Sequence, residues 1–236
     1  MKTNLILICY FVLISGFSQL KEGRAIYNVK TSINFQNIES ENDKQVLKKI
    51  FNETEQVSKT YFELLFNKKE SIFYGYSQLI KNENKIDLVN INAKIIGSVY
   101  VNLSEGEVIQ KKEKFGETFL VNFKTDSFEW ELINESIKFG DYTCFKAVLK
   151  NQKQKRNKTI EWYTPDIQFQ FGPLGYSGLP GFIILLKDDI FIYSLGKVRF
   201  SLTDREKKKI RKPKKGIKVT RSEYDSIYRV MTKEEY

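Results

Sequence analysis

The chain has 236 residues and a formal net charge of +10, with 39 lysines and arginines against 29 aspartates and glutamates. It contains no histidine, which excludes Ser-His-Asp and Cys-His catalysis, histidine-ligated zinc and proton transfer through imidazole. Of its two cysteines, only Cys144 lies outside the N-terminal leader described next, so no intramolecular disulfide is expected. Cys144 is interpreted as a buried, inert thiol, with a reactive thiol as the alternative.

The N-terminus has the pattern of a secretory signal peptide. Lys2 precedes an apolar run over 5–14, and the small residues Gly16 and Ser18 follow it. The run is too short to cross a bilayer as a stable helix, which takes ~20 apolar residues. We therefore expect residues 1–18 to be removed and the protein to be exported. It would then be periplasmic or secreted, without a stable transmembrane anchor.

Residues 19–236 are predicted to form one mainly β (α+β) domain, because short alternating apolar segments are separated by turn residues. Since consecutive strands with short joints form meanders, the expected fold is a curved antiparallel β-meander or a partly closed, barrel-like sheet. The segments 61–66 and 71–74 predict a hairpin within it. The predicted strands are 23–35, 61–66, 71–74, 95–103, 106–114, 117–123, 127–134, 142–150, 158–163, 167–171, 182–187 and 190–200.

Two helices are predicted to cover the sheet, one N-terminal and one C-terminal. Over 43–59, apolar residues such as Val46 and Ile50 keep helical spacing. Near the C-terminus, Thr220 and Glu223 make a Thr-x-x-Glu capping box, which is typical of a helix start. Both helices are expected to pack on the sheet rather than to bind a partner.

Positive charge is concentrated in residues 205–221, which hold ten basic side chains against a single acid, Glu206. Loss of Lys2 with the leader lowers the net charge of the protein from +10 to +9. The segment 205–221, with ten basic residues and one acid, carries a net charge of +9 by itself, so the rest of the mature chain is formally neutral. For an exported protein it predicts a surface for lipid or lipopolysaccharide head groups, or for an outer-membrane or other envelope protein, and not for nucleic acid. The alternative is a solvated lysine-rich loop. The residues of this basic surface are Lys207, Lys208, Lys209, Arg211, Lys212, Lys214 and Lys215.

Glycines recur at every third position from Gly172 to Gly181, and the run ends in Gly178-Leu-Pro-Gly-Phe-Ile183. Three blocks precede this ending: Gly140-Asp-Tyr-Thr-Cys-Phe-Lys-Ala147, Trp162-Tyr-Thr-Pro-Asp-Ile167 and Phe171-Gly-Pro173. In order and spacing, the four blocks resemble the GLPGLI family. The resemblance implies an exported protein of Bacteroidetes-type bacteria. That family has no established biochemical activity, so the resemblance supplies no catalytic residues.

The glycine-rich run has two interpretations. As a structural plug, it closes one end of the sheet, with Trp162 and Tyr176 packed on it. As a rigid rim, it borders a binding pocket, with Glu161 and Asp166 as polar groups. The binding residues of the second interpretation are Trp162, Tyr163, Asp166, Tyr176, Gly178, Leu179, Pro180 and Gly181. No metal site or cofactor is expected, since histidine and the phosphate-loop patterns are absent.

Two functions remain open on the sequence. The first is a non-catalytic binding or carrier module, in which an aromatic-lined sheet holds an apolar or anionic envelope ligand or an envelope protein. An assembly factor for an outer-membrane protein differs from it only in the partner. The second is a hydrolase of glycan or peptide that uses the carboxyls of Glu161 and Asp166. This second function requires the two carboxyls to converge in an open cleft.

Overall fold

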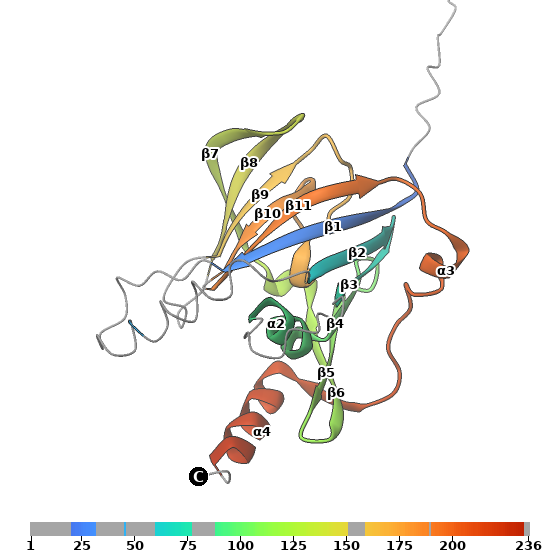
Figure 1. The fold of residues 1–236 in the computed structure, drawn as a ribbon, viewed down its shortest axis with the longest axis vertical. Coiled ribbons are helices and arrows are strands. Elements are labelled where there is room, and N and C mark those ends of the chain that lie inside the picture. The colour runs from blue at the N-terminus through green and yellow to red at the C-terminus, as the bar shows by residue number, and fades with distance from the viewer. Residues whose placement is uncertain are drawn as a thin grey trace, which may run out of the picture.

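Twelve strands form one large, open, curved sheet in the computed structural model, which describes residues 20–31, 45, 60–76, 88–150, 159–188 and 190–233 (Figure 1). In order along the chain, the strands are β1 (Glu22–Thr31), β2 (Tyr61–Asn67), β3 (Glu70–Tyr76), β4 (Ser98–Asn102), β5 (Glu107–Lys114), β6 (Glu117–Lys124), β7 (Trp130–Phe139), β8 (Tyr142–Leu149), β9 (Ile160–Thr164), β10 (Phe182–Lys187), β11 (Phe191–Arg199) and β12 (Ile217–Thr220). The helices of this described part are α2 (Leu88–Ile96), α3 (Asp204–Lys207) and α4 (Arg221–Lys233). The predicted β-rich fold is confirmed.

Two antiparallel meanders meet at β1, in the middle of the sheet. The first runs from β1 to β6, and the second runs from β7 to β11, which returns to pair with β1. β12 pairs in parallel with β6 and forms one edge, and β7 forms the other. Only residues 125–129 join β6 to β7, a reach of ~20 Å, so the sheet must curl until its two halves approach at this corner. There the rings of Phe123 and Phe128 lie 5.9 Å apart.

The main core lies on the concave, inner face of the sheet. The loop over 165–181 fills this face and touches both halves of the sheet. Phe169 packs on Phe66 of β2 with ring centroids 4.7 Å apart, and the indole N–H of Trp130 on β7 donates to the Ser177 carbonyl at 2.9 Å. Contacts with both halves mean that the curled sheet wraps around this loop. We call residues 165–181 the plug.

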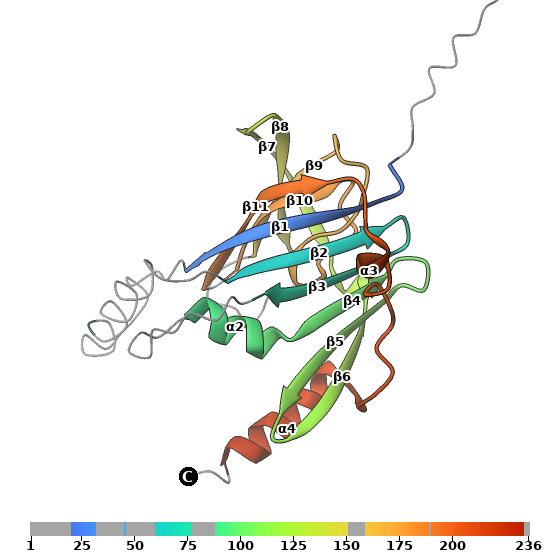
Figure 2. The same ribbon diagram turned by 45° about the vertical axis from the view of Figure 1, so that its right-hand side comes forward.

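The outer face is crossed by an extended segment, residues 200–216, that leaves β11, includes α3 and reaches β12 (Figures 1 and 2). We call this segment the strap. After β12, α4 packs Tyr224 on Phe119 of β6, with ring centroids 5.4 Å apart. The predicted C-terminal covering helix is therefore confirmed. No described helix is both long and apolar enough to cross a membrane.

The capping box predicted at the start of α4 is also confirmed. The Thr220 N–H donates to Glu223 Oε2 at 2.6 Å, and the Glu223 N–H donates to Thr220 Oγ1 at 3.3 Å. We expect Thr220→Ala to destabilise α4 by ~1 kcal/mol and to speed amide exchange in its first turn. Hydrogen exchange measures the effect, with Thr232→Ala, near the end of the helix, as the matched control. Unchanged exchange in the first turn of Thr220→Ala would contradict the prediction.

Three strand predictions differ from the structure. The strand predicted at 127–134 instead covers Trp130–Phe139 as β7. The strand predicted at 167–171 is wrong, because these residues belong to the plug and only Phe171 forms an isolated bridge, with Ser177. Its alternating apolar residues are buried although they lie in a loop, and alternation alone cannot distinguish such a loop from a strand. The strand predicted at 95–103 begins only at Ser98. Gly97, with φ +67°, ends the preceding helix α2, which the sequence did not predict.

Other predictions fall on residues that the structure does not describe. The signal peptide over 1–18 lies outside the described residues. The N-terminal helix over 43–59 also lies outside them, apart from residue 45.

The hairpin predicted at 61–74 is present as β2 and β3.

Candidate anion-binding groove

A groove with a cavity volume of about 1010 Å³ lies between the strap and the outer face of the sheet. Its floor comes from β3, β4 and β5, whose alternation points every second side chain outward. Its wall comes from the strap, which supplies five basic side chains. The lining residues are Ile72, Tyr74, Ser98, Lys111, Lys209, Arg211, Lys212, Pro213, Lys214 and Lys215.

The strap is held on the sheet mainly by ion pairs, and none of its side chains is fully buried. Glu206 accepts two hydrogen bonds from Arg199, at 2.7 and 2.8 Å, and lies 3.6 Å from Arg24. Lys207 pairs with Glu22 at 2.9 Å. Burial acts to raise the pKa of Glu206, but hydrogen bonds from Thr203 and the Arg199 charge lower it below the ordinary value. The carboxylate is therefore ionised at neutral pH and fixes the first half of the strap.

Tyr74 is the centre of a hydrogen-bonded cluster at the end of the groove. Its hydroxyl donates to Glu63 Oε2 at 2.6 Å, and Glu63 is also paired with Arg24. Lys209 Nζ donates to the Tyr74 hydroxyl at 2.9 Å and lies 4.9 Å from its ring centroid. Burial and the hydrogen bond to Glu63 raise the pKa of Tyr74, so the phenol stays neutral. The cluster places the Lys209 ammonium group at a defined point of the groove.

Three cations of the groove have neither an ion-pair nor a hydrogen-bond partner among the described residues. Arg211, Lys214 and Lys215 make no ion pair or side-chain hydrogen bond with any residue in the described ranges, and all three are exposed. In contrast, Lys212 pairs with Glu105 and Glu107, at 3.1 and 2.5 Å. Unpaired cations beside a concave surface raise the local concentration of anions. The second half of the strap therefore carries uncompensated positive charge.

The sequence-predicted basic surface is only partly assembled into this groove. Lys209, Arg211, Lys212, Lys214 and Lys215 line it. The other two predicted residues, Lys207 and Lys208, lie on α3 or next to it and do not line it. Sequence reasoning missed the floor residues, including Tyr74 and Lys111. No sequence signal joins them to the strap, because the strap crosses the sheet only in the folded chain.

The residues predicted to form a binding rim mostly serve the core. Tyr176 and Leu179 are buried, at 9% and 1% exposure, and Tyr163 is 7% exposed. Gly181 is buried, whereas Gly178 and Pro180 are exposed. Since Tyr176 packs on Phe128 and Trp130, the structure favours the plug interpretation. None of these residues lines the groove.

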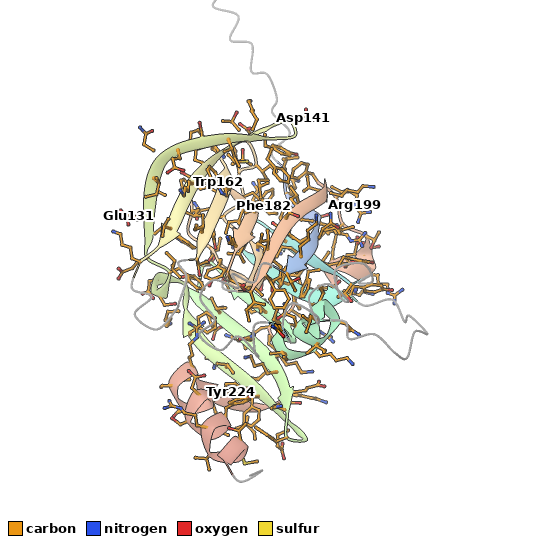
Figure 3. The ribbon with its side chains drawn as sticks, turned by 60° about the vertical axis from the view of Figure 1, so that its left-hand side comes forward. Glu131, Asp141, Trp162, Phe182, Arg199 and Tyr224 are labelled. Carbon is orange, nitrogen blue, oxygen red and sulfur yellow. The ribbon has the colours of Figure 1, made fainter. Side chains whose placement is uncertain are left out.

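One detail of the plug interpretation is wrong. The tryptophan that holds the plug is Trp130, through its bond to the Ser177 carbonyl. Trp162 lies on β9, opposite Leu185 of β10 in register, and is half-buried, with Lys146 Nζ 5.9 Å from its ring centroid (Figure 3). Strand alternation turns Trp162 away from the face of Glu161. Trp130 and Trp162 therefore lie on opposite faces of the sheet.

The two carboxyls proposed for hydrolysis do not share an open cleft. Glu161 is 0% exposed, and neither carboxyl oxygen has a hydrogen-bond partner among the described residues. Burial raises the pKa of Glu161 well above its ordinary value, which favours the neutral acid over the carboxylate. Asp166 lies beyond the end of β9, is exposed, and accepts a hydrogen bond from the Thr143 N–H at 3.4 Å. Substrate in solvent cannot reach both groups.

The remaining catalytic and metal-binding options gain no support. Cys144 is 0% exposed, and burial with the nearby Asp166 charge raises the pKa of its thiol to about 11, which disfavours the reactive thiolate. Within the described ranges, no group of three or more acidic or cysteine side chains is arranged to hold a metal ion. The groove therefore remains the candidate site.

Comparison with protein families gives a match to one segment of the chain. Residues 149–185, which run from the end of β8 through the plug into β10, match the family model described as a protein of unknown function (Porph_ging). This match is compatible with the GLPGLI resemblance, because the segment contains Gly178–Gly181. No curated protein matches the chain.

Two solved structures are similar in fold, both of PNGF-II. The structure in the C2 space group has a TM-score of 0.51 at 17% identity and covers 87% of this chain and 32% of that one. The structure in the P21 space group has a TM-score of 0.53 at 16% identity, with 88% and 33% covered. The chain thus spans about a third of the length of these structures. By these likenesses, the protein has the sheet architecture of one part of PNGF-II, and its 149–185 segment is similar to the Porph_ging family of unknown function.

Proposed function

We propose that the protein is a non-catalytic binding module for an anionic ligand of the cell envelope, and that the groove under the strap is its site. The observation that carries the proposal is the set of unpaired cations, Arg211, Lys214 and Lys215, on the wall of a groove. The envelope location rests on the signal-peptide pattern of residues 1–18.

Two features favour a site over a solvated lysine-rich loop. First, contacts of Lys209 with Tyr74 and of Arg199 with Glu206 hold the strap on the sheet, so the chain that carries its cations lies along one wall of the cavity. Second, the lining combines charge with apolar surface from Ile72 and Pro213, and binding sites commonly pair a few polar groups with apolar walls. The buried, neutral Glu161 supports a non-catalytic role, because it removes one of the two carboxyls that hydrolysis would need.

The test is calorimetric titration with inorganic tripolyphosphate at 50 mM and 300 mM NaCl. We expect the unaltered protein to bind at low salt and to bind more weakly at high salt, because salt screens exposed charges. The triple variant Arg211→Glu, Lys214→Glu and Lys215→Glu should lose affinity by roughly 30-fold or more, since each exposed charge contact contributes up to ~1 kcal/mol.

The matched control reverses three exposed lysines of the other meander, Lys138, Lys150 and Lys187. It changes the net charge of the protein by the same amount but leaves the groove intact. Equal losses in the two triple variants would show that net charge alone attracts the anion, and would overturn the proposal. Absence of binding by the unaltered protein at low salt would overturn it as well.

A further inference from the structure

An exposed aromatic pair continues the groove along the same face of the sheet. Tyr61 of β2 and Tyr76 of β3 are directly opposite in register, and their rings stack with centroids 5.1 Å apart and planes at 27°. Tyr76 is 45% exposed. Stacked tyrosines in an ordinary core would be covered, whereas Tyr76 of this pair leaves part of its aromatic side chain open to solvent.

The aromatic pair and the groove are neighbours through Tyr74. Tyr76, Tyr74 and Ile72 occupy alternate positions of β3 and therefore share the outer face, spanning ~13 Å from first to last. Ile72 and Tyr74 line the groove, and Lys209 lies over the Tyr74 ring. Along β3 the face thus presents an aromatic platform, then a single ammonium group, then the wall of unpaired cations.

We propose that the ligand is an anionic oligosaccharide, whose sugar ring stacks on the Tyr61–Tyr76 platform while its acidic groups meet Lys209 and the groove cations. This inference rests on the proposed function and names the ligand class. A small inorganic anion would use the cations but not the platform. A sugar ring has an apolar C–H face that suits an aromatic ring, and several linked rings match an elongated face with spaced cations.

The experiment compares two probes of similar charge, tetragalacturonic acid, which has rings, and inorganic tripolyphosphate, which has none. We expect Tyr76→Ala to weaken binding of tetragalacturonic acid by roughly tenfold and to leave tripolyphosphate binding unchanged. Tyr76→Leu, which keeps an apolar side chain on the strand, should show the same loss, and Tyr76→Phe should retain affinity. Tyr228→Ala, at an exposed tyrosine of α4, is the matched control.

The outcomes separate this inference from the proposed function. Tripolyphosphate could bind in the groove while the Tyr76 variants bind tetragalacturonic acid as tightly as the unaltered protein does. In that case the assignment of an oligosaccharide ligand is wrong, and the proposed anion site stands. Equal weakening of both probes by Tyr76→Ala and Tyr76→Leu also overturns the inference, since it shows damage to the groove and not loss of stacking. If neither probe binds the unaltered protein, the proposed function fails, and this inference fails with it.

Discussion

Glu161→Gln is expected to remove a pH-dependent loss of stability from the protein. Glu161 is 0% exposed and has no hydrogen-bond partner for either oxygen within the described residues. Two tyrosines, Tyr27 and Tyr176, interact electrostatically with it, and burial raises the pKa of both, that of Tyr176 to about 12. Both phenols are therefore neutral below pH 8, and Glu161 is the group in this cluster that can change charge.

The direction of the effect follows from the raised pKa of Glu161. In the unfolded chain the carboxyl loses its proton near its ordinary pKa, whereas in the folded protein it keeps the proton to higher pH. The contribution of Glu161 to stability is therefore fully present at pH values below the unfolded pKa. It is lost as the pH rises toward the folded pKa, because ionisation favours the unfolded chain. The slope is ~1.4 kcal/mol per pH unit over that interval.

Urea unfolding followed by tryptophan fluorescence, from pH 4.5 to 7.5, measures the free energy of unfolding. The difference between Glu161→Gln and the unaltered protein should grow in favour of the variant as the pH rises above the unfolded pKa, with the slope given above, until the pH reaches the folded pKa. Glu135→Gln, at an exposed carboxylate paired with Lys146, is the control and should show no such growth. Parallel pH curves for Glu161→Gln and the unaltered protein would mean that Glu161 is already ionised in the folded state.

Gly181→Ala is expected to be the most damaging change in the glycine-rich run, and to cost ~3 kcal/mol. An added Cβ would lie 2.2 Å from the Thr164 carbonyl oxygen and 2.6 Å from its carbonyl carbon. Because the obstacle is backbone, no side-chain rotation can relieve it. Thr164 is also the register partner of Phe182, where the pairing of β9 and β10 begins, so the clash would separate two adjacent strands of the sheet.

Gly178→Ala provides the comparison within the same motif. Gly178 has φ +88°, but an added Cβ would meet only Trp130 Nε1, at 3.9 Å. The cost should be confined to the left-handed backbone conformation, ~1 kcal/mol. Thermal or urea unfolding of both variants measures the difference. Equal costs would show that positive φ, and not close backbone approach, explains the motif.

Local patterns predicted the parts of the fold that depend on neighbouring residues. Alternation over 61–74 placed the β2–β3 hairpin, and the Thr220 capping box placed the start of α4, because turns and caps involve residues only a few positions apart. Alternation failed over 167–171, where a loop buries every second residue without a strand partner. It also missed α2, whose Asn and β-branched residues have modest helix propensity and whose helix is stabilised by packing on the sheet.

The candidate site could be predicted only in part, for the same reason. A run of like charges is visible in any sequence, so the cations from Lys209 to Lys215 were found. Which of them lack a partner depends on where the strap lies. Glu105, in a turn, and Glu107, at the start of β5, neutralise Lys212 from about a hundred residues away, and Arg211 has no such neighbour in the described part of the chain.

Composition and local order by themselves determined the classes of chemistry, the β-rich character, the absence of histidine and the glycine-rich motif. These properties depend on which residues are present and on spacings of a few positions. Tertiary structure alone decided that β11 returns to β1, that Glu161 is a buried neutral acid and that the strap forms a groove over Tyr74. Burial and long-range pairing depend on the position of the whole chain in space, and the energies of charge and hydrogen bonding change with burial.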